Sequence, residues 1–240
     1  MPPIEIALLI AAAIFIGSLV QGAVGLGLGL VGAPALTLLT PELMPGTILW
    51  LSAVLPVFTL AREWRAIDWW GLRWALLGRM PATVVGAWIV TAVSARMLGV
   101  LVAVVILTAV LLTLRTVRLP MRVSLLVGAG VISGVTGTAT SIGGPPLALL
   151  YQHELGPRVR STLATYFVVG AGASLVGLAV VGELTMAQTT TAGWLVLPMA
   201  AGFASSGPVR RRVDGDRLRV AVLSVCAASA LVVLVRSLVG

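Results

Sequence analysis

The sequence predicts an all-α polytopic membrane protein built from two repeats, and three observations support this fold class. Hydrophobic residues make up 59% of the 240 positions and charged residues only 10%, a balance that soluble domains do not have. The mean hydropathy of +1.09 agrees with several apolar spans. The third observation is a pair of glycine-rich segments, GAVGLGLGLVGAP at residues 22–34 and GVTGTATSIGGPP at residues 134–146, with a constant offset of 112 positions. The sequence therefore predicts one transmembrane domain made of two halves, residues 1–120 and 121–240.

Both glycine-rich segments predict an interrupted helix. Each lies inside a long apolar stretch, and each ends in proline followed by a further apolar run. Glycine permits positive φ and a close approach to the backbone, while proline suits the first turn of a new helix, where its missing N–H costs no hydrogen bond. The first stretch, residues 4–39, is too long for one straight span of about 20 residues. We therefore expect each segment to form a broken helix or a re-entrant helical hairpin.

Six further apolar runs, three in each half, predict transmembrane helices that follow the broken segments. The predicted spans are residues 46–60, 74–93 and 97–114 in the first half and residues 161–181, 190–209 and 218–235 in the second half. Pro56 predicts a kink within the first of them. Residues 62–73 combine arginine with tryptophan, which predicts a segment at the membrane interface. The same order of elements in both halves indicates an internal duplication.

The distribution of arginine decides between two topologies. All 16 basic residues are arginines, and if both broken segments crossed the membrane their clusters would fall on opposite sides, contrary to the rule that cytoplasmic loops are positive. If both segments are hairpins that return to the side they entered, 14 arginines are cytoplasmic and only Arg96 and Arg236 lie outside. The two halves then enter the membrane from opposite sides. The sequence therefore predicts two inverted repeats with broken helices, an architecture typical of secondary transporters.

These residues carry a resemblance to a known family. The paired GxxG and GxP patterns, the odd number of spans in each half and the stretch GWLVLPMAAGFASSGPVRRRV at residues 193–213 resemble the toluene-sulfonate uptake permease family, also called the sulfite exporter TauE/SafE family. The resemblance covers nearly the whole chain and implies transport of small sulfur-containing anions, such as sulfite, thiosulfate, sulfonates or sulfoacetate, across the inner (cytoplasmic) membrane of a prokaryotic cell. The family pattern transfers to Gly22, Gly25, Gly32 and Pro34, and to Gly134, Gly137, Gly144, Pro145 and Pro146.

The polar residues independently favour an anion as the substrate. All eight carboxylates fall in loops or at span ends, so a buried metal ion or Na⁺ would have no acidic ligand. An oxyanion can instead be bound by backbone N–H groups at two facing helix N-termini, each equivalent to about half a positive charge, and by polar side chains at the breaks. For each side chain the alternative is a hydrogen bond to a carbonyl of its own helix, and for the glycines it is close helix packing. The candidate side chains are Gln21, Ser133, Thr136, Thr138, Thr140 and Ser141.

Arg79 is a further candidate for the anion site, because it falls within a predicted span, beside Pro81. We favour the alternative interpretation, in which its side chain snorkels to the cytoplasmic face. His153 is the one histidine of the chain and lies beside Glu154. The sequence leaves open whether it relays protons or is a solvated loop residue.

The sequence predicts a carrier without a cofactor, a metal or catalytic activity, which works by alternating access around the two breaks. No nucleophile with a base falls within the spans, and the arginines sit in short clusters that fit topology signals and not nucleic-acid binding. The expected partners are a small anionic substrate, the lipid bilayer and, as one candidate coupling ion, the proton. A passive anion channel and a non-transporting membrane subunit stay open as alternatives, as do the identity of the anion, the direction of transport and the oligomeric state.

Overall fold

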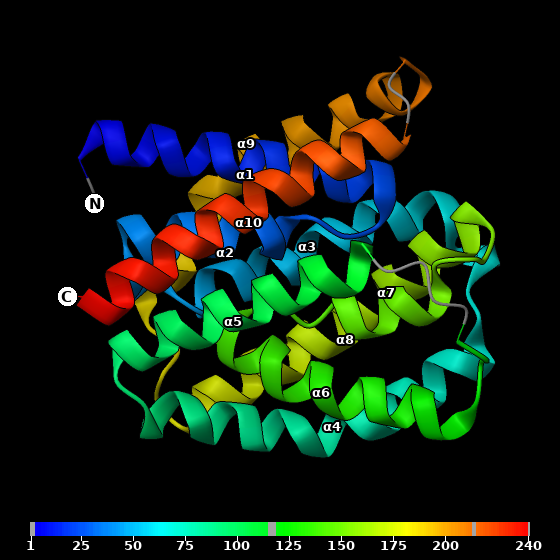
Figure 1. Cartoon of the computed structure of the whole chain (residues 1–240), viewed down its shortest axis with the longest axis horizontal. Helices are drawn as coiled ribbons and strands as arrows, with labels where there is room; N and C mark the ends of the chain where they lie inside the picture. The colour runs from blue at the N-terminus through cyan, green and yellow to red at the C-terminus, as the bar shows by residue number, and fades with distance from the viewer. Residues whose placement is uncertain (1–2, 115–118, 213–214, 240) are drawn as a thin grey trace.

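The computed structural model describes residues 3–114, 119–212 and 215–239 and consists of a bundle of helices (Figure 1). The described residues form ten α-helices and two short 3-10 helices, and no strand occurs among them, which confirms the all-α prediction. The helices are α1 (Ile4–Val24), α2 (Leu28–Leu39), η1 (Pro41–Leu43), α3 (Gly46–Glu63), η2 (Trp64–Ala66), α4 (Trp69–Ala92), α5 (Ala95–Leu114), α6 (Val123–Thr140), α7 (Pro145–Tyr151), α8 (Gly156–Val180), α9 (Met186–Arg212) and α10 (Gly215–Val239).

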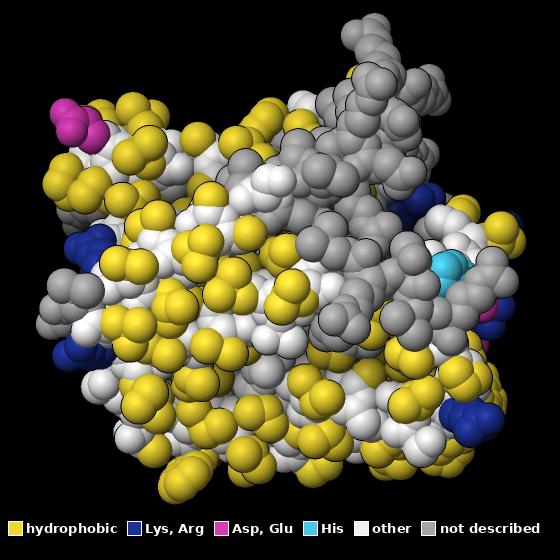
Figure 2. Space-filling model, viewed as in Figure 1, with side chains coloured by type: hydrophobic (Ala, Val, Ile, Leu, Met, Phe, Trp, Pro, Cys, Tyr) yellow, Lys and Arg dark blue, Asp and Glu magenta, His cyan; other side chains and the backbone are white. Residues whose placement is uncertain are grey.

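The surface of the bundle is that of a membrane protein. Of the described helices, α1, α4, α6 and α8 are long and apolar enough to cross a membrane. Large apolar side chains such as Val84 and Trp88 of α4 are 69% and 65% exposed, which lipid tolerates and water does not. Figure 2 shows hydrophobic side chains over the middle of the visible face and charged side chains towards its two ends. The chain is therefore a multi-pass membrane protein.

The largest differences between predicted and observed bounds are at α4 and α8, which begin at Trp69 and Gly156, each five residues earlier than predicted. Asp68, directly before α4, is held by two other helices. Its carboxylate accepts a hydrogen bond from the Tyr151 hydroxyl at 2.7 Å, and its backbone N–H donates to the Thr162 hydroxyl at 2.9 Å. This anchor fixes the point at which the chain enters α4. The predicted interfacial segment 62–73 is therefore divided between α3, η2 and α4.

The first predicted break is confirmed between α1 and α2. Gly25 ends α1 in the left-handed conformation, with φ of +102°, and its N–H donates to the carbonyl oxygen of Gln21 at 2.7 Å. The chain then turns back along α1. The evidence is that a Cβ built at Gly17 of α1 would lie 3.0 Å from the Cα of Leu28 in the first turn of α2. Pro34 was predicted at the start of the new helix. It lies inside α2 instead, because the helix already resumes at Leu28.

The second predicted break is confirmed between α6 and α7. Here the left-handed residue is Ser141, with φ of +62°, and not a glycine. Its hydroxyl donates to the carbonyl oxygen of Pro45 at 2.8 Å, directly before α3. This contact helps to hold the backbone of Ser141 in a conformation that non-glycine residues rarely adopt. Pro145 occupies the first turn of α7, as predicted.

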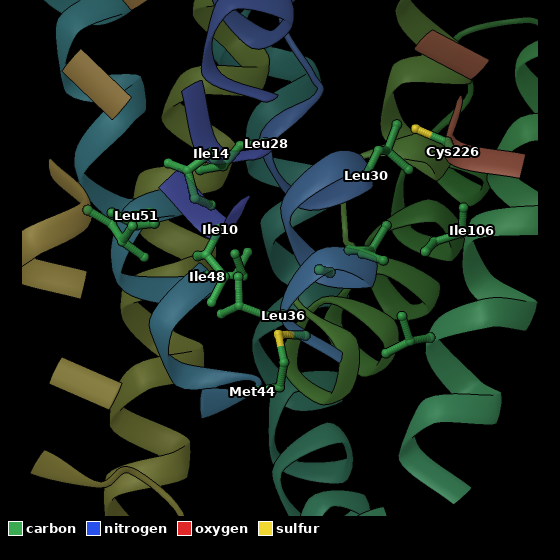
Figure 3. Close-up of a cluster of buried hydrophobic side chains, with 14 of the residues drawn as sticks. Ile10, Ile14, Leu28, Leu30, Leu36, Met44, Ile48, Leu51, Ile106 and Cys226 are labelled. Carbon is green, nitrogen blue, oxygen red and sulfur yellow. The ribbon is translucent and has the colours of Figure 1, made fainter. Parts of the chain in front are cut away.

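Apolar side chains pack around α2 in the largest buried cluster (Figure 3). Leu28, Leu30 and Leu36 of α2 are at most 4% exposed. They meet Ile10 and Ile14 of α1, Ile48 and Leu51 of α3, Ile106 of α5 and Cys226 of α10. The second arm of the first break is therefore enclosed by protein.

The helices of the two halves pack in matching pairs. α1 packs parallel to α9, α6 packs parallel to α4, α3 packs antiparallel to α8, and α5 packs against α10. We match α1 to α5 in order with α6 to α10. The pair α1 and α9 then corresponds to the pair α6 and α4, and the pairs α3 with α8 and α5 with α10 each correspond to themselves. Helices α1 and α6 run in opposite directions (Figure 1). Exchange of the two halves thus preserves the main packing contacts.

Glycines bring α4 and α6 into close contact. A Cβ at Gly130 of α6 would overlap the carbonyl oxygen of Ala75, and one at Gly78 of α4 would overlap that of Val127. Neither position has room for a methyl group, because the backbone of the other helix fills the space. Gly128, also in α6, differs in that no described atom lies within 4 Å of a Cβ built there.

Replacing Gly130 by alanine is expected to lower the melting temperature of the purified protein in detergent. Overpacking of a close contact typically costs about 1–3 kcal/mol. The matched control is Gly128→Ala, which makes the same change in helix propensity without a clash. Equal melting temperatures of the two variants would contradict the close contact between α4 and α6.

Candidate functional site

The two breaks lie against each other inside the bundle. A Cβ at Gly29, in the first turn of α2, would lie 2.8 Å from the carbonyl oxygen of Ser141 in the second break. Both breaks line a cavity of about 30 Å³, which we call the central cavity. It has room for about two water molecules. Its lining residues are Gln21, Leu26, Gly27, Gly29, Leu30, Leu49, Ser52, Arg79, Gly137, Ser141, Ile142, Gly143, Gly144, Pro145, Phe167 and Ala171.

One charged side chain lines the central cavity, that of Arg79 from α4, which is only 2% exposed. Its Nη1 donates to the Ser133 hydroxyl at 3.1 Å, and its guanidinium carbon lies 4.6 Å from the centre of the Tyr166 ring. Its Nε has no hydrogen-bond partner, and no acid among the described residues forms an ion pair with it. The interpretation that Arg79 snorkels to the cytoplasmic face is therefore wrong.

Two glycines explain why the guanidinium of Arg79 is buried. A Cβ at Gly170 of α8 would overlap its Nε, and one at Gly137 of α6 would lie 3.2 Å from its Nη2. Because α6 and α8 both pack on α4, these glycines leave a space into which the side chain points. Burial of a guanidinium without a counter-charge costs several kcal/mol. A small anion in the central cavity would supply that charge.

The hydroxyl groups predicted at the second break already donate hydrogen bonds to backbone carbonyls. The acceptors are the carbonyl oxygens of Gly143 for Ser133, Ile132 for Thr136, Gly134 for Thr138, Thr136 for Thr140 and Pro45 for Ser141. Thr136, Thr138 and Thr140 thus bind carbonyls of their own helix, the alternative that the sequence left open, whereas Ser133 and Ser141 bind carbonyls outside α6. Of the five, Ser141 lines the central cavity. The observed hydrogen bonds of these hydroxyls therefore stabilise the broken helix. Binding of an anion by the same hydroxyls stays a prediction.

Two neutral side chains of the central cavity have donors to spare. The Oε1 of Gln21 accepts from the backbone N–H of Leu28 at 3.0 Å, and its amide N–H groups have no acceptor among the described residues. Ser52 of α3 is 8% exposed, and its hydroxyl has no hydrogen bond within the described part of the chain. Gln21 was predicted from its place at the first break. Ser52 was missed, because a single serine in an apolar span gives no signal of its position.

The two new helices contribute unequally to the central cavity. The first turn of α2, with Gly29 and Leu30, presents backbone N–H groups that have no carbonyl one turn earlier within the helix. Helix α7 starts with Pro145 and Pro146, which have no N–H. The second break therefore offers fewer N–H groups than the first, and binding of an anion between the two facing helix N-termini stays a prediction. The guanidinium of Arg79 supplies the donors there.

The other predicted residues are divided between the central cavity and its surroundings. Gly137, Gly144 and Pro145 line it, together with Gln21, Ser141 and Arg79. Some of the family positions pack elsewhere, namely Gly22 beside α9, Gly25 at the end of α1, Gly32 and Pro34 within α2, and Gly134 against α4. His153 is exposed between α7 and α8 and does not line the central cavity.

A helical membrane protein in which two interrupted helices enclose a buried arginine side chain has the features of a membrane transporter. The sequence model of the sulfite exporter TauE/SafE family matches residues 9–233, and the chain belongs to this family. The resemblance is therefore confirmed, and with it a place among the membrane transporters of sulfur-containing anions. Neither a curated protein nor a solved structure matches the chain.

Replacing Gly170 by alanine is expected to weaken sulfite binding to the purified protein, as measured by calorimetry. The added methyl group would displace the Arg79 guanidinium. Loss of a hydrogen bond to a charged group lowers affinity about 10-fold to 100-fold.

The matched control is Gly172→Ala in the same helix, where no described atom lies within 4 Å of the new methyl group. Unchanged sulfite affinity in Gly170→Ala would show that the position of Arg79 does not matter for binding.

Proposed function

We propose that the chain is a secondary transporter that carries a small sulfur-containing oxyanion across the cytoplasmic membrane and binds it in the central cavity. The observation that carries this proposal is the guanidinium of Arg79, which is buried between the two helix breaks without a counter-charge. A buried charge of this kind is typical of a substrate site in a membrane protein. Membership of the TauE/SafE family supports a sulfur-containing anion as the substrate.

The donors around the central cavity favour an oxyanion. The planar guanidinium of Arg79 can donate to two oxygens of one ligand, as it does to carboxylates and phosphates. The amide of Gln21, the hydroxyl of Ser52 and the first turn of α2 add further donors from three other helices. No carboxylate of the described residues lines the central cavity to accept from an ammonium group. A zwitterion such as taurine is therefore expected to bind less well than sulfite or an anionic sulfonate of similar size.

We further propose that residues 1–120 and 121–240 form inverted repeats whose broken helices are re-entrant hairpins. The matching helix pairs support this, as do the opposite directions of α1 and α6. Arg96 and Arg236, predicted to be outside, bind backbone carbonyls of Ser237 and Leu38 at one common end of the bundle. The arginines at residues 115–118 lie outside the described residues. Alternating access would then consist of a rearrangement of the two halves around the central cavity.

Among the described acids, Asp68 is the most buried candidate for a proton carrier. Burial raises its pKa, but the hydrogen bond from Tyr151 and the nearby guanidinium of Arg158 lower it more, so that the pKa lies below the usual value. Asp68 therefore stays ionised at neutral pH and pairs with Arg158 at 3.3 Å. A group that cycles protons near pH 7 needs a pKa close to that value. Asp68 thus does not favour coupling to protons.

Replacing Arg79 by glutamine is expected to abolish saturable sulfite uptake into proteoliposomes, because the uncharged side chain leaves the anion without its counter-charge. Thr138→Ala is the control, because the Thr138 hydroxyl already binds Gly134 and Ser174 and does not line the central cavity. Normal uptake by Arg79→Gln together with lost uptake by Thr138→Ala would move the site to the hydroxyls of α6.

The same proteoliposomes distinguish the proposed carrier from its alternatives. Uptake that saturates and shows counterflow supports a carrier. A current proportional to voltage indicates a passive channel, and the absence of flux from correctly inserted protein indicates a non-transporting subunit.

Single cysteines in a Cys226→Ala background are expected to locate the two ends of the bundle. A membrane-impermeant maleimide should label cysteines at positions of Glu42 and Glu183 from outside and one at the position of His153 only from the cytoplasm. The reason is that the proposed hairpins return to the side they entered. Labelling of the positions of Glu42 and His153 from the same side would contradict the inverted topology.

A further inference from the structure

A second cavity in the bundle has a volume of about 70 Å³. We call it the end cavity. It is formed where α1 and α3 end and α8 begins, and α9 closes it. The lining residues that matter for its chemistry are Gly22, Thr59, Arg62, Glu63, Arg160 and Ser206.

Two helices show how the cavities are placed. On α3, Ser52 lines the central cavity and Thr59, seven residues later, lines the end cavity. On α8, Phe167 lines the central cavity and Arg160, seven residues earlier, lines the end cavity. Seven residues are two helical turns, or about 10 Å. Because α3 and α8 are antiparallel, both shifts point to the same end of the bundle, which the arginine distribution assigns to the cytoplasm.

Counted over the residues that the structure describes, the lining of the end cavity carries one surplus positive charge. Arg160 binds Glu63 through two hydrogen bonds, from Nε at 3.0 Å and from Nη2 at 2.6 Å, so these two charges neutralise each other. Arg62 has no acid partner in the described part of the chain. Its guanidinium carbon instead lies 5.6 Å from the centre of the Phe203 ring. Cation–π contact uses the face of a guanidinium and leaves its N–H edge free for a ligand.

Further donors point to a ligand that accepts hydrogen bonds. The Thr59 hydroxyl has no hydrogen bond among the described residues, and the same holds for Nη1 of Arg160. Gly22 lets α1 and α9 approach closely at the wall of the end cavity, because a Cβ there would overlap the Ser206 side chain of α9. A net positive charge, free donors from two helices and a closed wall together suit a small oxyanion.

We propose that the end cavity is a second anion-binding site, which holds the same class of small oxyanion between the central cavity and the cytoplasm. The inference rests on the proposed transport of such an anion. Arg160 also packs on the first break, since a Cβ at Gly25 would lie 3.2 Å from its Cγ. An anion that competes with Glu63 for Arg160 therefore acts on the residue that ends α1. Arg62 is exposed, so binding at this site is weaker than at Arg79 and falls as salt is added.

The test is a calorimetric titration of sulfite into the purified protein in lipid nanodiscs. The wild-type protein is expected to show a stronger and a weaker class of site. Arg62→Gln should lower the affinity of the weaker class about 10-fold to 100-fold and leave the stronger class unchanged. Arg79→Gln should do the reverse. Arg65→Gln is the matched control, because Arg65 is exposed on the neighbouring turn, lies over Trp64 and lines neither cavity.

The outcomes separate the two proposals. A single class of site that Arg79→Gln removes and Arg62→Gln leaves intact would overturn the second site while the proposed function holds. If Arg62→Gln removes one class of site and Arg79→Gln leaves sulfite binding unchanged, the result supports the second site and counts against the central one. Thr59→Val removes a hydroxyl at nearly constant volume and should weaken the same class about 10-fold, which keeps the test decisive if Arg62→Gln does not fold.

Discussion

The buried positive charge of Arg79 is the constraint on which the rest of the structure depends. A guanidinium in a low-dielectric interior is tolerated only with compensation, and the chain gives partial compensation through the Ser133 hydroxyl and the Tyr166 ring. Glycines at positions 137 and 170 keep the space free for it. In the proposed function, the part of the charge that these contacts leave uncompensated would drive anion binding. A bundle that is apolar towards lipid thus has a buried positive charge at its centre.

The two halves share one plan but divide the chemistry between them. The first break offers the N–H groups at the start of α2 and the amide of Gln21. The new helix at the second break begins with two prolines, so few N–H groups are free there. The guanidinium of Arg79, from the first half, donates to Ser133 beside this break. An interrupted helix inside a membrane needs partners for its open ends, and the hydroxyls of α6 meet that need by binding carbonyls.

The sequence predicts those features that depend on local chemistry. The apolar runs determine the helical class, and the glycine and proline residues locate both breaks within a few positions. Whether the Arg79 side chain is buried or snorkels to the membrane surface depends on tertiary structure, because the two cases differ only in which helices cover that face of α4. Ser52 could not be found for the same reason. The early start of α4 depends on contacts of Asp68 with Tyr151 and Thr162, far along the chain. Pro34 was misplaced because proline inside a helix and proline at its start give the same local pattern.

The single charge in the central cavity has an electrical consequence. A monovalent anion such as a sulfonate or hydrogen sulfite neutralises one guanidinium completely, whereas a divalent anion such as sulfate leaves an excess negative charge in a medium that solvates it poorly. In the proposed transport cycle, the loaded centre would then be electrically neutral and the empty centre positive. Membrane voltage acts on charge that moves through its field. It would therefore bear on the return of the empty protein and leave the step that carries the anion almost unaffected.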